Sequence, residues 1–496
     1  MKHLILSLFI ILFSSFVFSQ TEGSNFNSTG KGVSTTFATD YQALGINPAN
    51  LGWTRKFEKK WVAIGLGESS FSLSTKLLNN EAIQNIASIP FDFDFKKSLK
   101  YEDYASLSSD LQSGIKLNAD VRLFGIAVTT NFLGGFAFSV TEKYRMSLNL
   151  SEDFSDIATY GYGAPYFDSL LVQSGSSIYN VANNPSNFDS LKNDTTSKII
   201  LGTSSNPKST TQLMNGTDFS ISWIREFNFG YGRKIIDLKA ITLYGGIGIK
   251  YIQGVALFDL NTSSSGVEGF GSYSTTFKDF SKGLLSGGGA KLKLPKIAGS
   301  GWGFDFGVNL QLFNKLKIGL AVNDIGSILW KDNTFKIKTK PHLDSLKLGG
   351  FNSSDIVKGT AIFDSILNQI VDIQHVNISR KVNLPSVMRF GASIQLGKIF
   401  EIGAEMVTPL NSTPGSYEHT FYSIGADLKL GPLKLSGGAV IKENQILTIP
   451  VGIGYEPTSG SMEMGISTRD VLSIINYKTI ENPTLSFAFG FVRFRI

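Results

Sequence analysis

Two serines occupy positions where a catalytic nucleophile could lie. Gly391-Ala-Ser393 and Gly465-Ile-Ser467 each begin like the Gly-x-Ser-x-Gly turn that presents the serine of a hydrolase. That turn requires a second glycine two residues after the serine, and neither segment has one. Both segments lie in alternating runs typical of strands. We interpret them as small residues in a sheet and predict no catalytic serine.

No residues are spaced to hold a metal or a cofactor. The chain has no cysteine, and its four histidines are isolated from one another. No glycine-rich phosphate loop stands between a strand and a helix. Glu401 and Glu405 would share one face of a strand and could line a wet lumen. We therefore expect a protein that is not an enzyme and needs no cofactor.

The composition favours closed antiparallel sheet over several soluble domains. The 496 residues include 51 Gly and 38 Phe, and only 17% are charged. Glycine allows bends and close strand contacts, while aromatic residues cover one face of a sheet. The formal charge of +6 comes from scattered Lys and Arg, so no nucleic-acid partner is predicted.

The first residues resemble an export signal. A basic start, an apolar run and Val17-Phe18-Ser19 predict a cleavable signal peptide over residues 1–19. No later stretch has ~20 consecutive apolar residues, as a membrane-spanning helix requires. If the protein enters a membrane, it must do so as a barrel.

Strand-like runs fill the rest of the chain. The clearest is Asp218–Arg225, where Phe219, Ile221 and Trp223 alternate with polar residues. Counting such runs gives about fourteen, which suits an all-β, antiparallel up-and-down barrel. A soluble sandwich of two domains stays open. The predicted barrel spans residues 56–496, with long loops at about 151–215, 261–289 and 331–380.

The last strand-like run gives a mixed signal about the barrel's surroundings. Its phenylalanines share one face up to Phe491, after which the pattern inverts and Arg493 and Arg495 fall in line with them. The sequence therefore leaves open whether the wall meets lipid or water.

The segment before the first run, residues 20–55, centres on Asn47-Pro48-Ala49. Asn-Pro is first of all a turn signal. Its apolar residues could pack against a barrel wall or line a ligand pocket. These residues are Phe37, Tyr41, Leu44 and Ile46.

Three further landmarks accompany this segment. Asp324-Ile-Gly326 is interpreted as a turn with a side-chain acceptor, and Asp305 as a second landmark of the same kind. Pro385 is expected to start a strand where no donor is needed.

Together these residues resemble the FadL-like barrels of Bacteroidota, a group that includes the PorV-type subunits of the type 9 secretion system. The likeness rests on Asn47-Pro48-Ala49, on Gly303-Phe-Asp305 with Asn323-Asp-Ile-Gly326, and on Leu384 to Gly391. It is nearest to uncharacterised Bacteroidota barrels that are understood to include the plug subunit of that system's translocon. The resemblance implies an outer-membrane barrel of about fourteen strands whose N-terminal segment folds into the lumen as a hatch.

Two functions follow from the resemblance. The first is a non-enzymatic subunit or plug, at the outer membrane or its periplasmic face, that docks on a large outer-membrane secretion channel. The alternative is a FadL-type channel for hydrophobic small molecules. In either case, outer-membrane lipid or lipopolysaccharide would be a further partner.

Overall fold

The computed structural model describes most of the chain. The described residues are 25–53, 62–79, 100–130, 132–238, 240–263, 266–275, 277, 296–339, 345–346, 371–397, 399–417, 419–442, 447–476, 480 and 483–496. The predicted signal peptide lies outside them.

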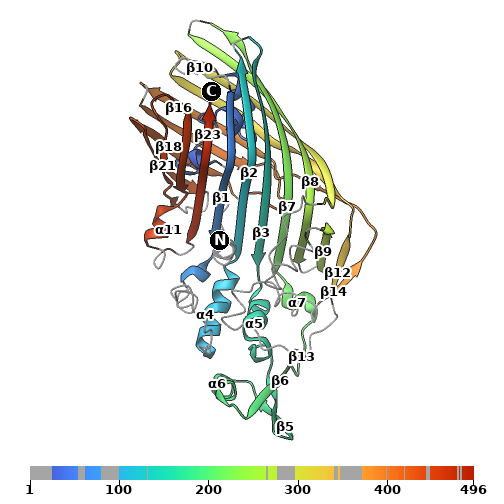
Figure 1. Cartoon of the computed structure of the whole chain (residues 1–496). Helices are drawn as coiled ribbons and strands as arrows, with labels where there is room; N and C mark the ends of the chain where they lie inside the picture. The colour runs from blue at the N-terminus through green and yellow to red at the C-terminus, as the bar shows by residue number, and fades with distance from the viewer. Residues whose placement is uncertain are drawn as a thin grey trace, which may run out of the picture.

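The described strands form a closed antiparallel barrel (Figure 1). Strand β1 (Val62–Ser74) pairs with β2 (Ile115–Thr130) on one side and with the last strand, β23 (Thr484–Arg495), on the other, so the sheet has no edge. The wall continues from β2 through β3 (Gly134–Asn149), β7 (Asp218–Asp237), β8 (Ile241–Ser263), β10 (Gly299–Leu312), β11 (Leu316–Trp330), β16 (Val387–Leu396), β17 (Phe400–Pro409), β18 (Phe421–Leu430), β19 (Leu433–Lys442), β21 (Val451–Tyr455) and β22 (Met462–Thr468). Short strands β15 (Arg380–Asn383) and β20 (Leu447–Thr448) extend it beside β11 and β19. These pairings give 14 wall strands among the described residues, which confirms the predicted all-β barrel and excludes the sandwich.

The two ends of the barrel differ. Connections such as residues 313–315 and 431–432 are tight turns at one end. At the other end the chain runs through residues 75–114 and 150–217 before it re-enters the wall. Bacterial outer-membrane barrels have short periplasmic turns and long extracellular loops. We refer to the short-turn end and the long-loop end below.

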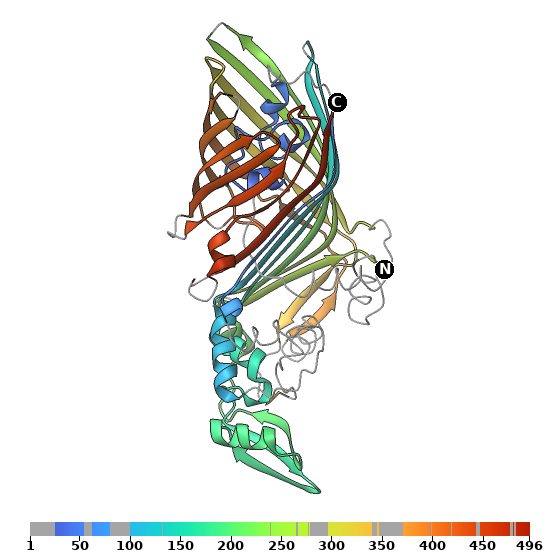
Figure 2. The same cartoon turned by 60° about the vertical axis from the view of Figure 1, so that its left-hand side comes forward.

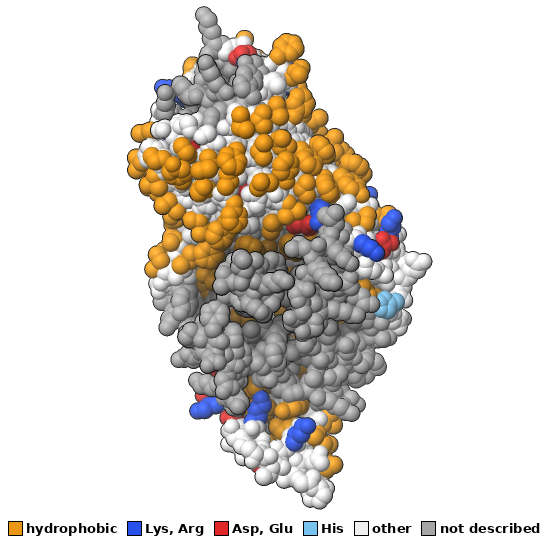
Figure 3. Space-filling view, viewed as in Figure 1, with side chains coloured by type: hydrophobic (Ala, Val, Ile, Leu, Met, Phe, Trp, Pro, Cys, Tyr) orange, Lys and Arg blue, Asp and Glu red, His pale blue; other side chains and the backbone are white. Residues whose placement is uncertain are grey.

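The outward face of the wall is apolar. On β10, Trp302 and Phe306 are 55% and 50% exposed, whereas the alternating Asp305 and Gly307 are buried. The same pattern gives a continuous apolar surface over the barrel half of the molecule (Figure 3). An exposed apolar surface of this extent suits contact with lipid rather than water. None of the helices in the described part of the chain is long and apolar enough to cross a membrane.

A β-bulge explains the inverted pattern of the last strand. The bulge lies between β22 and β23, where the register shifts between the pairs Glu463–Arg493 and Gly465–Gly490, so β23 has one extra residue there. Beside it on β1, Gly67 has a left-handed φ of 67°. The inside-outside alternation therefore changes phase in both β1 and β23. Glu68, Arg493 and Arg495 face the lumen and are buried, while Phe491 on the other side of the bulge stays exposed.

The N-terminal segment lies inside the barrel (Figure 2). Its described part, residues 25–53, contains α2 (Phe26–Thr29), η1 (Asp40–Ala43) and η2 (Pro48–Gly52) and is almost wholly buried. The predicted hatch in the lumen is thus present. We call residues 25–53 the hatch.

The expected loop at 151–215 connects two wall strands but has a fold of its own, which we call the insertion. It contains α5 (Glu152–Tyr160), η4 (Gly161–Gly163), β4 (Ser169–Ser174), β5 (Ser177–Ala182), α6 (Pro185–Asn193), β6 (Ser197–Thr203) and α7 (Thr210–Met214). Its helix N-termini are capped by Ser151, Asn184 and Ser209. Phe154, Phe188 and Leu170 pack in one core with Tyr104 of α4 (Tyr101–Gln112), a helix from the connection between β1 and β2. Polar composition therefore did not mean an irregular loop.

The other two expected loops are partly strands. Strand β9 (Gly266–Tyr273) lies within 261–289, and β12 (Phe335–Thr339), β13 (Ser345–Leu346) and β14 (Val371–His375) lie within 331–380. Strands β9, β12 and β14 continue the sheet from β8 at the long-loop end. The remaining elements are η3 (Lys76–Asn79) and α11 (Val471–Ile475).

Candidate functional site

Glycines let the hatch approach the barrel wall closely. A Cβ added to Gly246 on β8 would lie less than 3.0 Å from backbone atoms of Pro48 and Ala49, and one added to Gly425 on β18 would meet the carbonyl oxygen of Lys31. Each of the 14 wall strands places at least one glycine against the hatch in this way. One from each strand is Gly65, Gly125, Gly135, Gly232, Gly246, Gly307, Gly319, Gly391, Gly403, Gly425, Gly438, Gly452, Gly465 and Gly490. The hatch therefore fills the lumen at this level.

Asn47-Pro48-Ala49 is fixed to the barrel wall at the level of these glycines. The Asn47 side chain accepts a hydrogen bond from the backbone N–H of Ala49 (3.1 Å) and donates one to the carbonyl oxygen of Val308 on β10 (3.3 Å). Pro48 occupies the first position of η2, where its fixed φ suits a helical turn. The motif is thus both a turn, as its residue types predict, and a contact with the wall.

Two wall carboxylates hold the middle of the hatch. Glu68 of β1 accepts hydrogen bonds from the Tyr41 hydroxyl (2.8 Å) and the Gln42 side-chain amide (2.7 Å), and pairs with Arg122 of β2 (2.8 Å). The Arg122 guanidinium also lies over the Tyr41 ring. All these groups are buried, so Glu68 and Arg122 form one buried polar network with the two hatch side chains.

The second carboxylate is Glu405 of β17. It accepts hydrogen bonds from the backbone N–H groups of Ser34 and Thr35, the latter at 2.9 Å, and from the Ser34 hydroxyl at 3.0 Å. Arg389 of β16 pairs with the same carboxylate (3.3 Å). Glu405 thus binds the hatch backbone directly.

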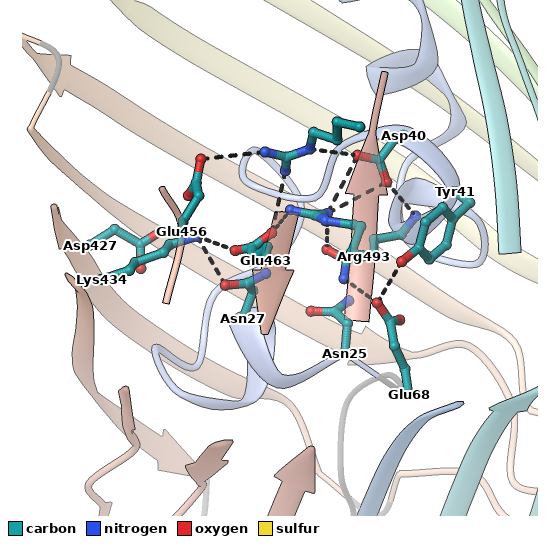
Figure 4. Close-up of polar contacts among 12 residues, drawn as sticks. Asn25, Asn27, Asp40, Tyr41, Glu68, Asp427, Lys434, Glu456, Glu463 and Arg493 are labelled. Carbon is teal, nitrogen blue, oxygen red and sulfur yellow. Dashed lines mark hydrogen bonds and ion pairs between the residues drawn. The ribbon is translucent and has the colours of Figure 1, made fainter. Parts of the chain in front are cut away.

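A larger ionic network holds the hatch on the side of β19 to β23 (Figure 4). Glu463 pairs with Arg493 and Arg495, and both arginines reach Asp40 of the hatch (3.4 and 3.6 Å). Lys434 bridges Glu463 (3.1 Å) to the Asn27 side chain (2.9 Å). Burial lowers the pKa of Lys31, near this network, to about 8, although the neighbouring Asp427 acts in the opposite direction.

The predicted turn at Asp324 is wrong. Asp324 and Gly326 lie inside β11, and Asp305 lies inside β10. Asp324 has a left-handed φ of 59° at a β-bulge between these strands, and its N–H donates to Asp305 (2.9 Å). Buried Lys250 pairs with both carboxylates. The turn-like residue types thus mark a bulge inside the wall. Pro385, by contrast, lies just before β16, where a strand was expected to start.

A cavity of about 120 Å³ adjoins the hatch in the lumen. Ser34, Leu44, Gly45 and Ile46 form its hatch side. On the walls of β2, β3 and β7 it is polar, and on those of β8, β11 and β15 it is mostly apolar. The polar lining on β2, β3 and β7 is Asn118, Asp120, Arg122, Thr141, Lys143, Arg145, Ser222, Glu226 and Asn228, and further polar lining residues are Asp324, Asn383, Arg389 and Tyr417. The apolar lining includes Leu257, Ile328, Trp330, Val382, Leu384, Pro385 and Val387.

The charged residues of this lining differ in whether their ion-pair partners also line the cavity. Lys143 pairs with Glu226 and Arg145 with Asp120, so these charges balance within the lining. The partners of Arg122 and Arg389, Glu68 and Glu405, do not line the cavity. Asp324 also lines the cavity, and its partner Lys250 does not. The lining therefore has four cations, Arg122, Lys143, Arg145 and Arg389, against three carboxylates, Asp120, Glu226 and Asp324, an excess of one positive charge. Arg122 and Arg389 lie on nearly opposite walls.

The predicted hatch residues divide between two roles. Phe37, Tyr41, Leu44 and Ile46 are all buried. Phe37 packs over Gly403, and the Tyr41 ring lies against Gly125, as packing against a wall requires. Leu44 and Ile46 border the cavity. Sequence reasoning missed Glu68, Arg122 and Arg389, although inward-facing charges in otherwise apolar strands were a signal that could have found them.

Neither a metal site nor catalytic geometry is present in the described part of the chain. No group of three or more His, Asp or Glu side chains among these residues is arranged to hold a metal ion. Ser393 faces Glu401 (2.9 Å), and Ser467 donates to the Phe26 carbonyl oxygen (2.7 Å). The same Glu401 oxygen also pairs with Lys317 (2.8 Å), so both serine hydroxyls take part in contacts within the wall or between wall and hatch.

Several solved structures of channels and transporters match this chain over nearly its whole length. A deletion mutant of the monoaromatic hydrocarbon channel TodX matches with 10% identity and a TM-score of 0.44, covering 96% of this chain and 99% of its own. A Pseudomonas aeruginosa FadL homologue (11%, TM-score 0.41, 96% and 98%) and the Pseudomonas putida toluene transporter TodX (12%, 0.38, 97% and 98%) also match. At such identities and scores the fold is better argued from the strand pairings above.

No curated protein matches the sequence. One family model does, over residues 186–449, which is more than half of the chain. The model describes a family of unknown function, DUF5723. The chain belongs to this family.

Proposed function

We propose that this protein is an outer-membrane channel that takes up a small amphiphilic molecule with an anionic group, and that the hatch closes its lumen. Its apolar outer wall and its short-turn and long-loop ends support insertion in the outer membrane, in contact with lipid. This is the FadL-type alternative from the sequence, with one change. The cavity has a charged side, so the ligand is amphiphilic rather than wholly hydrophobic.

The observation that supports this proposal is the position of Arg122 and Arg389. Each lines the cavity and also pairs with a carboxylate that holds the hatch. An anionic group in the cavity would compete with Glu68 or Glu405 for the arginine. A carboxylate that loses its cation in a buried site becomes less stable there. Ligand binding would therefore weaken the bonds between wall and hatch.

The test compares decanoate with decanol, which has the same chain length and no charge. We expect the protein in lipid nanodiscs to bind decanoate at least tenfold more tightly than decanol. Arg389→Gln should abolish this preference. Lys317→Gln is the control, because Lys317 forms a comparable buried pair with Glu401 (2.8 Å) and does not line the cavity. Equal binding of the two probes, or equal loss in both variants, would refute the proposal.

Docking on a large secretion channel is a second proposal. The feature that favours it is the insertion, which packs with α4 in one hydrophobic core at the long-loop end. A small-molecule channel does not need a folded unit there. Affinity purification of the tagged protein should recover a very large outer-membrane partner, and recovery of the protein alone would count against docking.

A further inference from the structure

The insertion ends in a β-sheet with one open edge. Its strands are ordered β13-β6-β4-β5, so among the residues that the structure describes β5 pairs with β4 only. The opposite edge is covered by β13, a two-residue strand from a distant part of the chain. In Figures 1 and 2, β5 lies at the end of the insertion farthest from the barrel. One edge of the sheet thus already pairs with a strand from a distant part of the chain, and the other edge, β5, lies away from the barrel.

Strand β5 lacks the features that protect exposed edges. Natural edge strands carry charges, prolines or bulges that prevent pairing with other chains. Residues 169–188 contain no Asp, Glu, Lys or Arg, and β5 has neither proline nor bulge. Ile178 and Tyr179 are 60% and 42% exposed, and they are the large exposed hydrophobic residues of the insertion.

The hydrogen-bond alternation along β5 identifies which of its backbone N–H and C=O groups are available to pair with another strand. Ser174 and Ser177 flank a two-residue turn and therefore form a hydrogen-bonded pair. By alternation, the backbone groups of Ile178, Asn180 and Ala182 point to the open edge. The Ala182 carbonyl oxygen accepts a hydrogen bond from the Asn187 side chain (2.8 Å), which agrees with this direction.

We propose that β5 is a docking strand, to which an extended, uncharged segment of another polypeptide outside the cell adds as a fifth strand. Backbone hydrogen bonds supply affinity in this mode, and side chains on alternate positions supply specificity. A second copy fits less well. Antiparallel self-pairing centred on Asn180 would set Ile178 opposite Ala182, whose methyl group covers little of the exposed side chain.

The test uses the full-length protein in nanodiscs and a fluorescent peptide, acetyl-Thr-Val-Thr-Val-Thr-Val-amide. We expect saturable binding by fluorescence anisotropy, at least tenfold weaker for Asn180→Pro, which removes one outward N–H. Gln173→Lys is the matched control. Gln173 lies directly opposite Ile178 on the same face, but on β4, so its charge should leave binding unchanged.

Three results would overturn the proposal. The first is no binding to the wild type, and the second is equal binding by Asn180→Pro. The third is self-association of the wild type that Asn180→Pro abolishes, which would make a second copy the occupant. Hydrogen exchange of the β4 amides should stay slow in Asn180→Pro, which shows that the hairpin itself is intact. A peptide N-methylated at alternate residues should not bind.

Discussion

Replacing Gly246 by alanine should displace the hatch. The added Cβ would lie 2.3 Å from the carbonyl carbon of Pro48 and 2.4 Å from the nitrogen of Ala49, whereas ordinary contacts begin at 3.4 Å. The two backbones must therefore separate by about 1 Å, the difference between 3.4 and 2.3 Å. They cannot do so freely, because the Asn47 side chain holds this turn to β10.

The expected cost follows from the close contact. Overpacking costs about 1–3 kcal/mol, and restriction of the unfolded chain by alanine returns about 0.4–1 kcal/mol. A net loss of about 1–2 kcal/mol would raise the displaced fraction of the hatch by roughly 5–30-fold. Gly437→Ala is the control, because its nearest atom would be the carbonyl oxygen of Pro450 at 3.8 Å.

The absence of cysteine from the chain makes the assay simple. Thr36→Cys places one thiol in the buried hatch, and its maleimide labelling rate reports displacement. The rate should rise 5–30-fold with Gly246→Ala and stay constant with Gly437→Ala. Equal rates in the two backgrounds, with both barrels folded, would refute the close fit between hatch and wall.

Four further outcomes are expected. Pro48→Ala should leave the barrel folded and raise the same labelling rate only a few-fold, because the lost restriction of φ is worth about 0.4–1 kcal/mol; an unfolded barrel would contradict this. Glu405→Gln should destabilise the hatch by about 1.5–3 kcal/mol in the labelling assay, since it removes a charged acceptor, whereas Glu401→Gln on the same strand should not. Phe188→Ala should cost the insertion about 3–5 kcal/mol and open it to hydrogen exchange while the wall stays protected; exchange across the whole protein would show that the two are not independent. Burial raises the pKa of Asp156 above its ordinary value, so the insertion loses stability as pH rises through that pKa. Amide hydrogen exchange in α5 should therefore be slower in Asp156→Asn than in the wild type at pH 7, but not at pH 3.

The barrel could be predicted because its signal is local. The sequence of each strand alternates with a period of two, and turn residues separate the strands. Asn47-Pro48-Ala49 was also accessible, since proline and asparagine determine the turn themselves. The insertion was not, because its core joins Tyr104 to Phe154 and Phe188 across distant segments whose surface residues are Ser, Asn and Thr.

The charged anchors show a second limit. Glu405 and Ser34 are 371 positions apart, and no local pattern relates them. The bulge between β22 and β23 changes the phase of the last strand through a single extra residue, so the sequence at Arg493 and Arg495 suggested a poor barrel strand when it encoded an ionic contact. Such sites depend on which strands become neighbours, which periodicity does not specify.

The glycines carry information that the strand count does not. A wet, open lumen needs no glycine on its inner face, but a lumen filled by a backbone needs one wherever that backbone approaches the wall. Direct pairs such as Gly65 with Gly125 and Gly403 with Gly425 place these positions side by side around the hatch. Because the hatch contacts every wall strand, these contacts oppose its leaving the lumen as a single rigid unit.

Movement is least opposed where the hatch borders the cavity. A Cβ on Gly45 would meet only the Lys250 side-chain nitrogen, at 3.7 Å, and Gly45 itself has a left-handed φ of 75°. Gly45 therefore has room that Pro48 and Lys31 lack, whereas the Leu44 side chain packs against Gly230. Leu44, Gly45 and Ile46 lie beside the cavity lined by Arg122 and Arg389. If the protein is the channel proposed above, its passage would open at Gly45, with the Asn47-Pro48-Ala49 turn as the fixed point about which the neighbouring hatch residues move.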